Sequence, residues 1–418
     1  MSNAIVSSDI GLTPIQIFSF PFMPNLLVAL VVSFSVCILI IATQRWHGRF
    51  SLDSDTGGVQ KVHIKSVPRT GGVALCAGVL AAACFDAFAT TTTATATGSG
   101  TQAGAGMFML LIASIPAFFS GVMEDLTKSV TPRRRLLAIL ASAFLAVWLL
   151  GASLPRVDVW GLDGMLVFIP FSIAITVFAV AGITNSINII DGFHGVAGIA
   201  IVIMLTGMGI IAWRSGDMLI LQLAATAIGA TIGFLMLNYP TGRLFMGDGG
   251  AYFLGFLAAE IAVLTILRNP TINAWQILAI YAYPVIEVLF SIYRRTMIYG
   301  ARVGAPDRLH LHSLFYRRCA RQRISGKKHP WMCNAWVACF IAAWIGTATA
   351  CSILFGNTIP AALVLVLLQF VLYIAVYMRL VRGHWGHCRH PAVILGLRPQ
   401  PRYDLVDGIL VGSPRAFG

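Results

Sequence analysis

Long apolar runs dominate this chain and restrict what it can fold into. A membrane-spanning helix needs about 20 mainly apolar residues, and eleven runs in the sequence come close to that length or reach it. They are 24–44, 71–89, 107–123, 136–150, 166–183, 196–213, 218–237, 251–267, 275–293, 334–355 and 360–380. A transmembrane barrel would instead show short alternating segments. The runs therefore predict an all-α polytopic membrane protein with about 11 transmembrane helices.

The composition excludes the main soluble alternatives. Of the 418 residues, 57% are hydrophobic and only 11% are charged, against about a quarter charged in a typical soluble domain. A soluble fold cannot hide that much apolar surface, because its own surface must be polar enough to stay dissolved. The net charge of +13 fits positively charged inner loops better than a nucleic-acid partner, so we expect no nucleic acid to bind.

The positive charges also predict an orientation. With the N-terminus outside, the inner segments hold 26 of the 29 Lys and Arg residues. These segments are 45–70, 124–135, 238–250, 294–333 and 379–418. Lys and Arg concentrate in cytoplasmic loops, so we expect the N-terminus outside and the C-terminus in the cytoplasm.

Acidic residues are scarce, and five of them fall on the same predicted side of the membrane. They are Glu124, Asp125, Asp191, Asp248 and Asp307. A carboxylate at the end of a membrane helix is costly unless it is solvated, paired or bound to a metal. Solvation explains any one of them as well as a function does. Several together, in motifs rich in Gly and Asn, favour a site.

Two of these motifs indicate a cation or phosphate ligand. Asn185, Asn188 and Asp191 are spaced i, i+3, i+6 and so lie near one face of a helix. That face could hold a hydrated cation or a sugar nucleotide, or it could be a polar stripe for helix packing. Asp248 stands among three glycines before an apolar run, where a carboxylate can bind Mg²⁺ and the helix N-terminus can favour phosphate. As a plain loop, the same segment needs no ligand.

The longest inner segment, 294–333, carries Asp307, Arg308, His310 and His312. Histidines at i and i+2 share one face of an extended strand and could contact phosphate or transfer a proton. The oxygen-rich partners favour Mg²⁺ over zinc. The surrounding basic residues could attract a diphosphate or anionic headgroups, or they could reflect topology alone.

Five motifs in this order carry a family resemblance. They are Lys61-x-His63 with Pro68-Arg69-x-Gly71-Gly72; Gly121-x-x-Glu124-Asp125-x-x-Lys128; Asn185-x-x-Asn188-x-x-Asp191-Gly192; Phe245-Met246-Gly247-Asp248; and Asp307-Arg308-x-His310-x-His312. With these motifs the chain resembles the polyprenyl-phosphate N-acetylhexosamine-1-phosphate transferases of the glycosyltransferase family 4 type. That family includes the enzymes that start O-antigen, common-antigen and teichoic acid chains, and the peptidoglycan lipid I synthase.

The resemblance implies a reaction and a location. A UDP-N-acetyl amino sugar donates its sugar-1-phosphate to undecaprenyl phosphate, giving undecaprenyl-diphospho-sugar and UMP, with Mg²⁺, or Mn²⁺ in its place. The protein would lie in the bilayer of the bacterial inner membrane, with its active site facing the cytoplasm. The identity of the amino sugar, and the choice between monomer and homodimer, stay open.

The apolar runs, the predicted orientation and the resemblance together predict a domain plan. Residues 1–23 would be a periplasmic segment, 24–380 a transmembrane catalytic domain, and 381–418 a cytoplasmic basic tail. The active-site loops of the catalytic domain would be 45–70, 124–135, 184–195, 238–250 and 294–333.

Residue roles follow from the same motifs. The implied metal ligands are Asp191 and Asp248. The implied catalytic residues are Glu124, Asp125, Asp191, His310 and His312. The implied substrate-binding residues are Lys65, Lys128, Asn185, Asn188, Asn238, Phe245 and Arg308. Phe245 could stack on the uracil ring, and the two lysines could contact phosphate.

The sequence departs from the family pattern at three positions. His194 replaces the usual second Asp of Asp-Gly-x-Asp-Gly, Ala251 replaces a Ser, and Glu124 replaces the first Asp of an Asp-Asp pair. A role that needs an anion at position 194 therefore does not carry over. The triple-His pattern of the lipid I synthase is absent, which favours the surface-polysaccharide branch.

Two other classes of protein remain as alternatives. A secondary transporter would place acidic residues near the bilayer midplane and show paired broken helices. A catalytically inactive lipid-binding scaffold would tolerate loss of the carboxylates, yet Asp125, Asp191 and Asp248 are all present. The transferase is the interpretation that we expect to hold.

Overall fold

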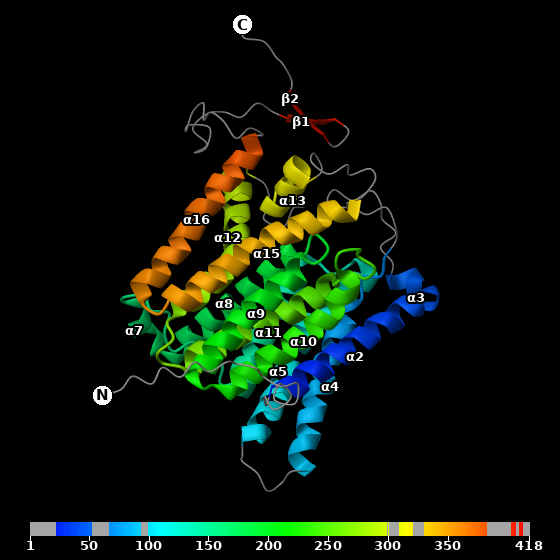
Figure 1. Ribbon diagram of the computed structural model, residues 1–418. Coiled ribbons are helices and arrows are strands. Elements are labelled where there is room, and N and C mark those ends of the chain that lie inside the picture. Colours follow the sequence, from blue (N-terminus) through cyan, green and yellow to red (C-terminus); the bar gives the residue numbers. More distant parts are fainter. Residues whose placement is uncertain are drawn as a thin grey trace, which may run out of the picture.

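A computed structural model describes residues 22–51, 67–92, 99–298, 300, 309–320, 330–382, 403–406 and 409–412, and these form a bundle of long helices (Figure 1). The long helices are α2 (Met23–Ala42), α4 (Gly71–Thr92), α5 (Ser99–Thr127), α6 (Pro132–Leu150), α8 (Ile169–Ile190), α9 (Val196–Ser215), α10 (Met218–Asn238), α11 (Gly247–Arg268), α12 (Ala274–Tyr293), α15 (Pro330–Phe355) and α16 (Ile359–Arg382). The short ones are α3 (Gln44–Ser51), α7 (Leu162–Leu166), α13 (Leu311–Phe315) and the π-helical turns η1 (Arg294–Ile298) and η2 (Tyr316–Ala320). Strands β1 (Tyr403–Val406) and β2 (Ile409–Gly412) pair antiparallel.

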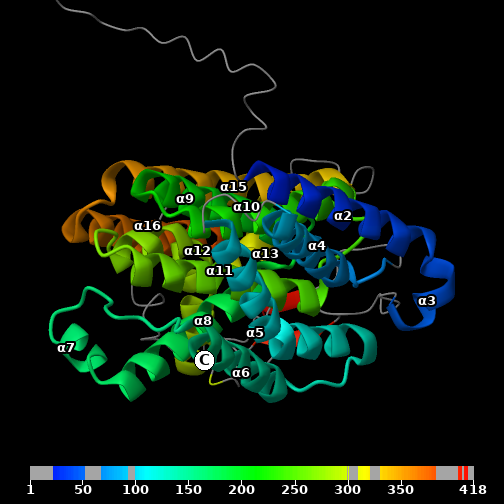
Figure 2. The ribbon, with the colours of Figure 1, turned by 90° about the horizontal axis from the view of Figure 1, so that it is seen from below.

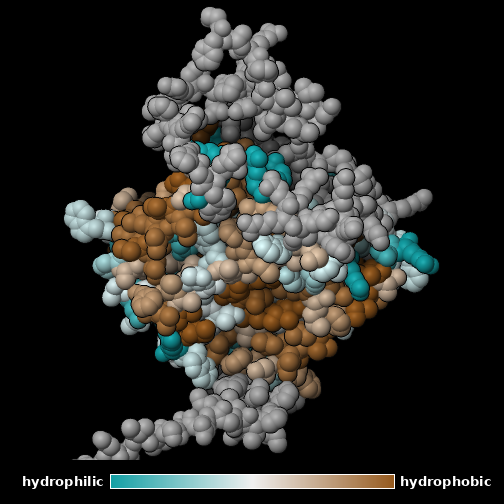
Figure 3. Space-filling view, turned by 45° about the horizontal axis from the view of Figure 1, so that its top comes forward, coloured by the Kyte–Doolittle hydropathy of each residue, from teal (hydrophilic) through white to brown (hydrophobic). Residues whose placement is uncertain are grey.

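The prediction of an all-α polytopic membrane protein is confirmed in its class. Ten helices of the described part are long and apolar enough to cross a membrane. The other predicted run, 136–150, lies in α6, which is 19 residues long and begins with Pro132 followed by three arginines. Those charges in its first turn are the reason that α6 is not among the ten. In the space-filling view, hydrophobic residues form a broad brown zone across the molecule (Figure 3).

Helix α11 is the centre of the bundle. Its residues are almost all buried, and it packs against α4, α5, α8, α9 and α10. Figure 2 shows these helices gathered around α11, with α2, α15 and α16 toward the periphery. Because α11 faces protein on all sides, it needs no lipid-facing stripe, and its sequence is apolar all round.

Glycine contacts bring α4 and α5 against the first turn of α11. A β-carbon on Gly121 of α5 would lie 2.5 Å from the amide nitrogen of Gly249, and one on Gly72 of α4 would collide with Gly250. The backbone also joins here, since the Gly71 and Gly72 N–H groups donate to the carbonyls of Phe245 and Met246, both at 2.9 Å. Only glycine allows backbones to approach this closely. The segment before α11 is therefore fixed against two other helices.

Two connections at the other end of the bundle contain helical segments. The segment 90–106 is rich in Thr, Ala and Gly, a composition typical of a flexible link; α4 extends into it as far as Thr92, and α5 begins within it at Ser99. Residues 155–165 carry Pro, Asp and Gly, which are typical of turns. The structure has an ion pair between Arg156 and Asp158 (2.7 Å), followed by the short helix α7. Asp158 also accepts from the Ala274 N–H, which ties this loop to the start of α12.

Candidate active site

The site is built at the end of the bundle that contains Asp125, Asp191 and Asp248, here called the carboxylate end. Asp125, in the last turn of α5, is 5% exposed and accepts two backbone hydrogen bonds from α11. The donors are the N–H groups of Asp248 and Gly249, both at 2.9 Å. Asp125 therefore caps the N-terminus of α11, where a carboxylate satisfies unpaired donors and complements the helix dipole. Because Asp125 takes these two donors, they are not open to a phosphate, one of the ligands that the sequence left possible at this helix start.

Asp248 is surrounded by donors from three other elements. Its carboxylate forms an ion pair with Arg135 of α6, and Asn188 of α8 donates to its Oδ1 at 3.2 Å. Arg69, which precedes α4, lies 3.9 Å from Asp248 and 3.8 Å from Asp125. Two guanidinium groups and two carboxylates thus meet at one point, in a partly buried setting where charge interactions are stronger than in water.

The start of α11 requires a glycine before Asp248. Gly247 has a φ of +74°, which side chains rarely adopt. A β-carbon there would also collide with the Arg69 carbonyl and the Asp125 carboxylate. This residue therefore sets the direction in which the Asp248 side chain leaves the backbone.

The end of α8 carries the three residues of the predicted polar face. Asn185 and Asn188 lie in its last turns, and Asp191 is the residue that ends the helix. Burial raises the pKa of Asp191 to about 7; the Arg69 guanidinium opposes this rise and the Asp248 carboxylate adds to it. Asp191 and Asp248 are therefore close enough to repel each other when both are ionised.

Glu124 and Asp125 are neighbours in sequence but have separate surroundings. Glu124 turns away from α11 and accepts the Val130 N–H at 2.8 Å, which closes the loop between α5 and α6. Lys128 lies in that loop, is exposed, and has a positive φ of 52°. The structure thus separates the two acidic residues into a loop-closing and a helix-capping position.

Asn238 and His194 connect the loops that flank the site. Asn238 is buried; its Oδ1 accepts the Gly195 N–H at 2.7 Å, and its Nδ2 donates to the Leu244 carbonyl at 2.8 Å. Burial lowers the pKa of His194, and its Nδ1 lies 3.2 Å from the Pro240 carbonyl. A neutral imidazole donating from Nδ1 fits this contact. The His194 ring packs on Phe245, with ring centroids 5.4 Å apart.

The loop histidines are anchored by a residue that the sequence motifs do not include. Glu287, buried within α12, accepts from His310 Nδ1 at 2.9 Å and from the Leu311 N–H at 3.1 Å. His310 is extended and His312 lies in the first turn of α13. Their rings still stack, with centroids 5.4 Å apart and planes within 6°.

His312 brings this loop to the end of α8. It is buried, and its Nε2 lies 3.1 Å from where a β-carbon on Gly192 would be. Its ring also packs edge-on against Phe193, with centroids 5.6 Å apart. A side chain at position 192 would therefore separate the histidine loop from Asp191.

The carboxylate end offers oxygen ligands for a metal, but no group of three. Among the described residues, no three of His, Cys, Asp and Glu converge as a metal cluster. The donors available are the carboxylates of Asp191 and Asp248 and the amides of Asn185 and Asn188. This set suits Mg²⁺, which is often held by one or two carboxylates together with water and substrate phosphate.

The structure adds some residues to the predicted set and leaves others aside. Lys65 and Arg308, predicted to bind substrate, lie outside the described residues. Arg135 and Glu287 were not among the predicted site residues. Arg135 belongs to a run of three arginines that topology alone explains, so no local signal separates it. Glu287 could have been identified from the sequence, because an ionisable residue inside a membrane helix is rare and indicates a functional role.

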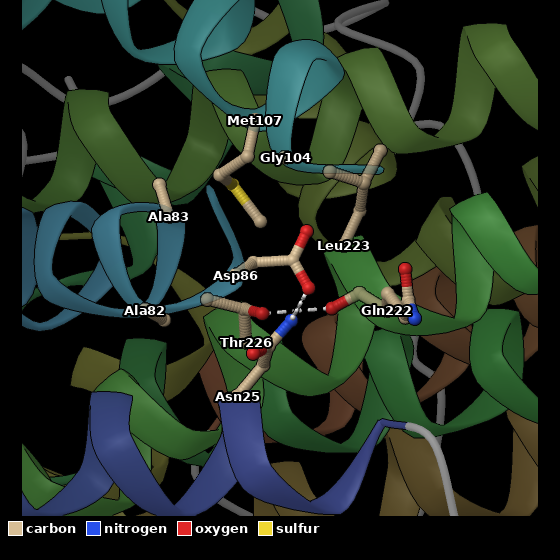
Figure 4. Close-up of a pocket in the computed structure, with 9 residues that line it drawn as sticks. All are labelled: Asn25, Ala82, Ala83, Asp86, Gly104, Met107, Gln222, Leu223 and Thr226. Carbon is tan, nitrogen blue, oxygen red and sulfur yellow. Dashed lines mark hydrogen bonds between the residues drawn. The ribbon is translucent and has the colours of Figure 1, made fainter. Parts of the chain in front are cut away.

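A second polar pocket lies at the opposite end of the bundle. Asn25 donates to Asp86 at 3.3 Å, and Gly104 and Thr226 also line the pocket (Figure 4). Its cavity of about 10 Å³ has room for one water. It is too small for a sugar nucleotide, so the carboxylate end is the stronger candidate for the active site.

Fold and site together define a class: a multi-pass helical membrane protein with arginines and carboxylates converging at one end of its bundle. Glycosyl transferase family 4 matches residues 107–266, which include Asp125, Arg135, Asn188, Asp191 and Asp248. Over these residues the chain is similar to the membrane transferases of this family.

Relatives match over a longer stretch. A protein of Bacillus subtilis (strain 168) described as a probable undecaprenyl-phosphate N-acetylglucosaminyl 1-phosphate transferase is 29% identical over 254 residues, 60% of this chain and 66% of the relative. A phospho-N-acetylmuramoyl-pentapeptide-transferase of Streptococcus thermophilus (strain CNRZ 1066) is 29% identical over 235 residues, 54% of this chain and 66% of the relative. The match thus spans just under two thirds of each relative.

Proposed function

We propose that this protein transfers a sugar-1-phosphate from a UDP-N-acetyl amino sugar to undecaprenyl phosphate, giving undecaprenyl-diphospho-sugar and UMP. The reaction would take place at the carboxylate end, at the cytoplasmic face of a bacterial inner membrane. The product would start a surface polysaccharide of the O-antigen kind. The positively charged segments at that side support this location. The similarity to the family and to the Bacillus subtilis relative supports a sugar-1-phosphate donor and an undecaprenyl-phosphate acceptor.

The observation that carries this proposal is the arrangement around Asp248. Arg69 and Arg135 both reach its carboxylate at the end of an apolar bundle. Joining a lipid phosphate to a nucleotide diphosphate brings two anions together, so catalysis needs charge neutralisation and alignment more than covalent chemistry. Two fixed guanidinium groups at the bilayer surface supply the first requirement.

Asp191 and Asp248 would hold Mg²⁺, with the amide oxygens of Asn185 and Asn188 beside them. When bound, Mg²⁺ neutralises charge on the diphosphate and polarises the phosphoryl group that is transferred. Asp125 acts as a positioning residue, because its two hydrogen bonds to α11 fix the turn that carries Asp248.

The remaining residues would bind or orient the substrates. His310 and His312 would donate hydrogen bonds to the diphosphate or move a proton near it. Lys128, exposed beside the site, would meet a phosphate. Phe245 would stack on the uracil ring, and Asn238 would keep that loop in place through its bonds to Gly195 and Leu244.

A second candidate is the first membrane step of peptidoglycan synthesis. It is favoured by relatives described as phospho-N-acetylmuramoyl-pentapeptide-transferases, such as the one from Streptococcus thermophilus. The motif of two histidines, rather than three in a row, argues for the surface-polysaccharide reaction instead. The two candidates share the acceptor and differ in the sugar donor.

The test is transfer of radiolabel from a panel of donors into undecaprenyl phosphate by the purified protein, with Mg²⁺ and with a chelator. The panel contains UDP-GlcNAc, UDP-GalNAc, UDP-linked 6-deoxy amino sugars and UDP-MurNAc-pentapeptide. We expect one amino sugar to be transferred, and only with the metal. Transfer of the MurNAc-pentapeptide donor alone would establish the second candidate, and transfer of none would refute both.

A further inference from the structure

A large apolar groove opens at the end of the bundle opposite the carboxylate end. It encloses about 430 Å³ between α2, α9 and α10, which is within the range of about 300–1,000 Å³ typical of pockets for small ligands. Its lining residues are Phe22, Leu26, Thr206, Gly209, Ile210, Trp213, Arg214, Leu221, Ala224, Ala225 and Ile228.

The groove exists because small residues form its floor where two helices separate. α2 and α10 touch closely at Gly229 and Gly233, where a β-carbon would collide with backbone carbonyls of α2. Further toward the start of α10, Ala224 and Ala225 leave space in front of α9. Gly209 on α9 adds to it, since a β-carbon there would meet only Leu221 Cδ1, at 3.6 Å. Ala224, Ala225 and Gly209 thus leave the space of the groove, which larger side chains at these positions would fill.

One cation, Arg214, lies at the rim of this apolar groove. Arg214 is in the last turn of α9, is exposed, and donates from Nη1 to the Ile353 carbonyl at 3.0 Å. That hydrogen bond orients the guanidinium and leaves its other donors available. The acidic residue nearby in sequence, Asp217, is already bonded to Arg268 and Asn269. Among the described residues, Arg214 has no carboxylate partner.

An apolar groove with a cation at its rim matches the chemistry of an anionic lipid. Trp213, 48% exposed, is placed beside Arg214, and tryptophan favours the level of the headgroups. The guanidinium of Arg214 can pair with a headgroup phosphate, while the apolar walls of the groove suit a hydrocarbon chain. We propose that this groove binds one anionic glycerophospholipid, with an acyl chain in the groove and its phosphate on Arg214.

This lipid would come from the leaflet opposite the carboxylate end. α9 begins beside Asp191 and His194 and ends at Ser215, and its 20 residues span roughly 30 Å. The groove is therefore separate from the active site, and the inference does not depend on the reaction that the protein catalyses.

The experiment is native mass spectrometry of the purified full-length protein, delipidated in detergent and then supplied with phosphatidylglycerol or with phosphatidylcholine. We expect one phosphatidylglycerol per chain to survive conditions that remove phosphatidylcholine. Gly209→Leu, which fills the groove without a backbone collision, should lower the retained fraction roughly tenfold. Arg214→Gln should remove the preference between the two lipids.

Two matched variants control for general effects of size and charge. Ala141→Leu adds bulk on an exposed face of α6, and Arg133→Gln removes an exposed cation at the carboxylate end; both should retain lipid as the wild type does. Equal retention of both lipids by the wild type would overturn the proposal, as would unchanged retention in Gly209→Leu. If deleting residues 2–16 raises retention from none to one lipid, the N-terminal segment is the occupant and the proposal is wrong.

Discussion

Replacing Asp125 by asparagine should destabilise the protein and slow transfer through one and the same cause. The Asp125 carboxylate accepts the N–H groups of Asp248 and Gly249, both at 2.9 Å. Asparagine has one acceptor oxygen, and its NH₂ group would face the second N–H as another donor. One buried donor at the start of α11 therefore loses its partner.

The loss of one hydrogen-bond acceptor sets the size of the expected destabilisation. A buried N–H without a partner costs about 1–3 kcal/mol, and loss of a helix cap costs a similar amount, about 0.5–2 kcal/mol. We expect the free energy of unfolding to fall by about 1–3 kcal/mol. Because the capped turn carries Asp248, kcat should also fall, and a displacement of about 1 Å can lower a rate on the order of 100-fold.

The assay combines thermal unfolding in detergent with kcat, KM and the Mg²⁺ concentration for half-maximal transfer. Glu124→Gln is the matched control, because glutamine keeps the one acceptor that the Val130 N–H needs; it should unfold as the wild type does. If Asp125→Asn unfolds like the wild type but needs far more Mg²⁺, Asp125 binds the metal directly and the capping account is wrong.

Three further substitutions test other contacts. Glu287→Gln should lower kcat about tenfold by loosening His310, and adding it to His310→Ala should cost nothing more, because the two residues act as a pair; additive losses in kcat would contradict this. Neither carboxylate oxygen of Glu260 has a hydrogen-bond partner among the described residues. Glu260→Met should therefore raise the free energy of unfolding by about 1–3 kcal/mol. Thermal unfolding measures this change, and a lower stability would show that the carboxyl is needed. Gly121→Ala should abolish transfer, because its β-carbon would lie 2.5 Å from the Gly249 nitrogen, whereas Gly106→Ala on the same helix meets nothing closer than 3.4 Å and should keep wild-type activity.

The sequence predicted the helices because the bilayer imposes length and hydropathy on each one independently. The ends of these helices were predictable for a similar reason. Asp248 lies in the first turn of α11 after Gly247, which has a positive φ, and Asp191 caps the end of α8 beside Gly192, so local chemistry marks both boundaries. α6 was the harder case, since the charges of its first turn reduce the apolar signal that identifies a span.

The partners of the site residues could not be predicted in the same way. Asp125 binds backbone groups 123 and 124 residues further along the chain, and such a pairing depends on how three helices pack at their glycines. Arg135 is one of three adjacent arginines, and only the direction of α6 shows which of them reaches Asp248. The sequence left a phosphate possible at the start of α11, but it could not show that the side chain of Asp125, from another helix, already takes two of the N–H donors there.

The central claim is that the carboxylate end performs the transfer, and Asp248→Asn tests it most directly. Radiolabelled sugar-phosphate transfer to undecaprenyl phosphate should be compared between the wild type and this variant at saturating Mg²⁺, with membrane insertion and thermal unfolding as checks of folding. Loss of a metal-binding carboxylate should cost about 4 kcal/mol of transition-state stabilisation, a fall of roughly 1,000-fold in kcat. The account predicts that loss in a protein that is inserted and folded; near-normal turnover by the folded variant would contradict it.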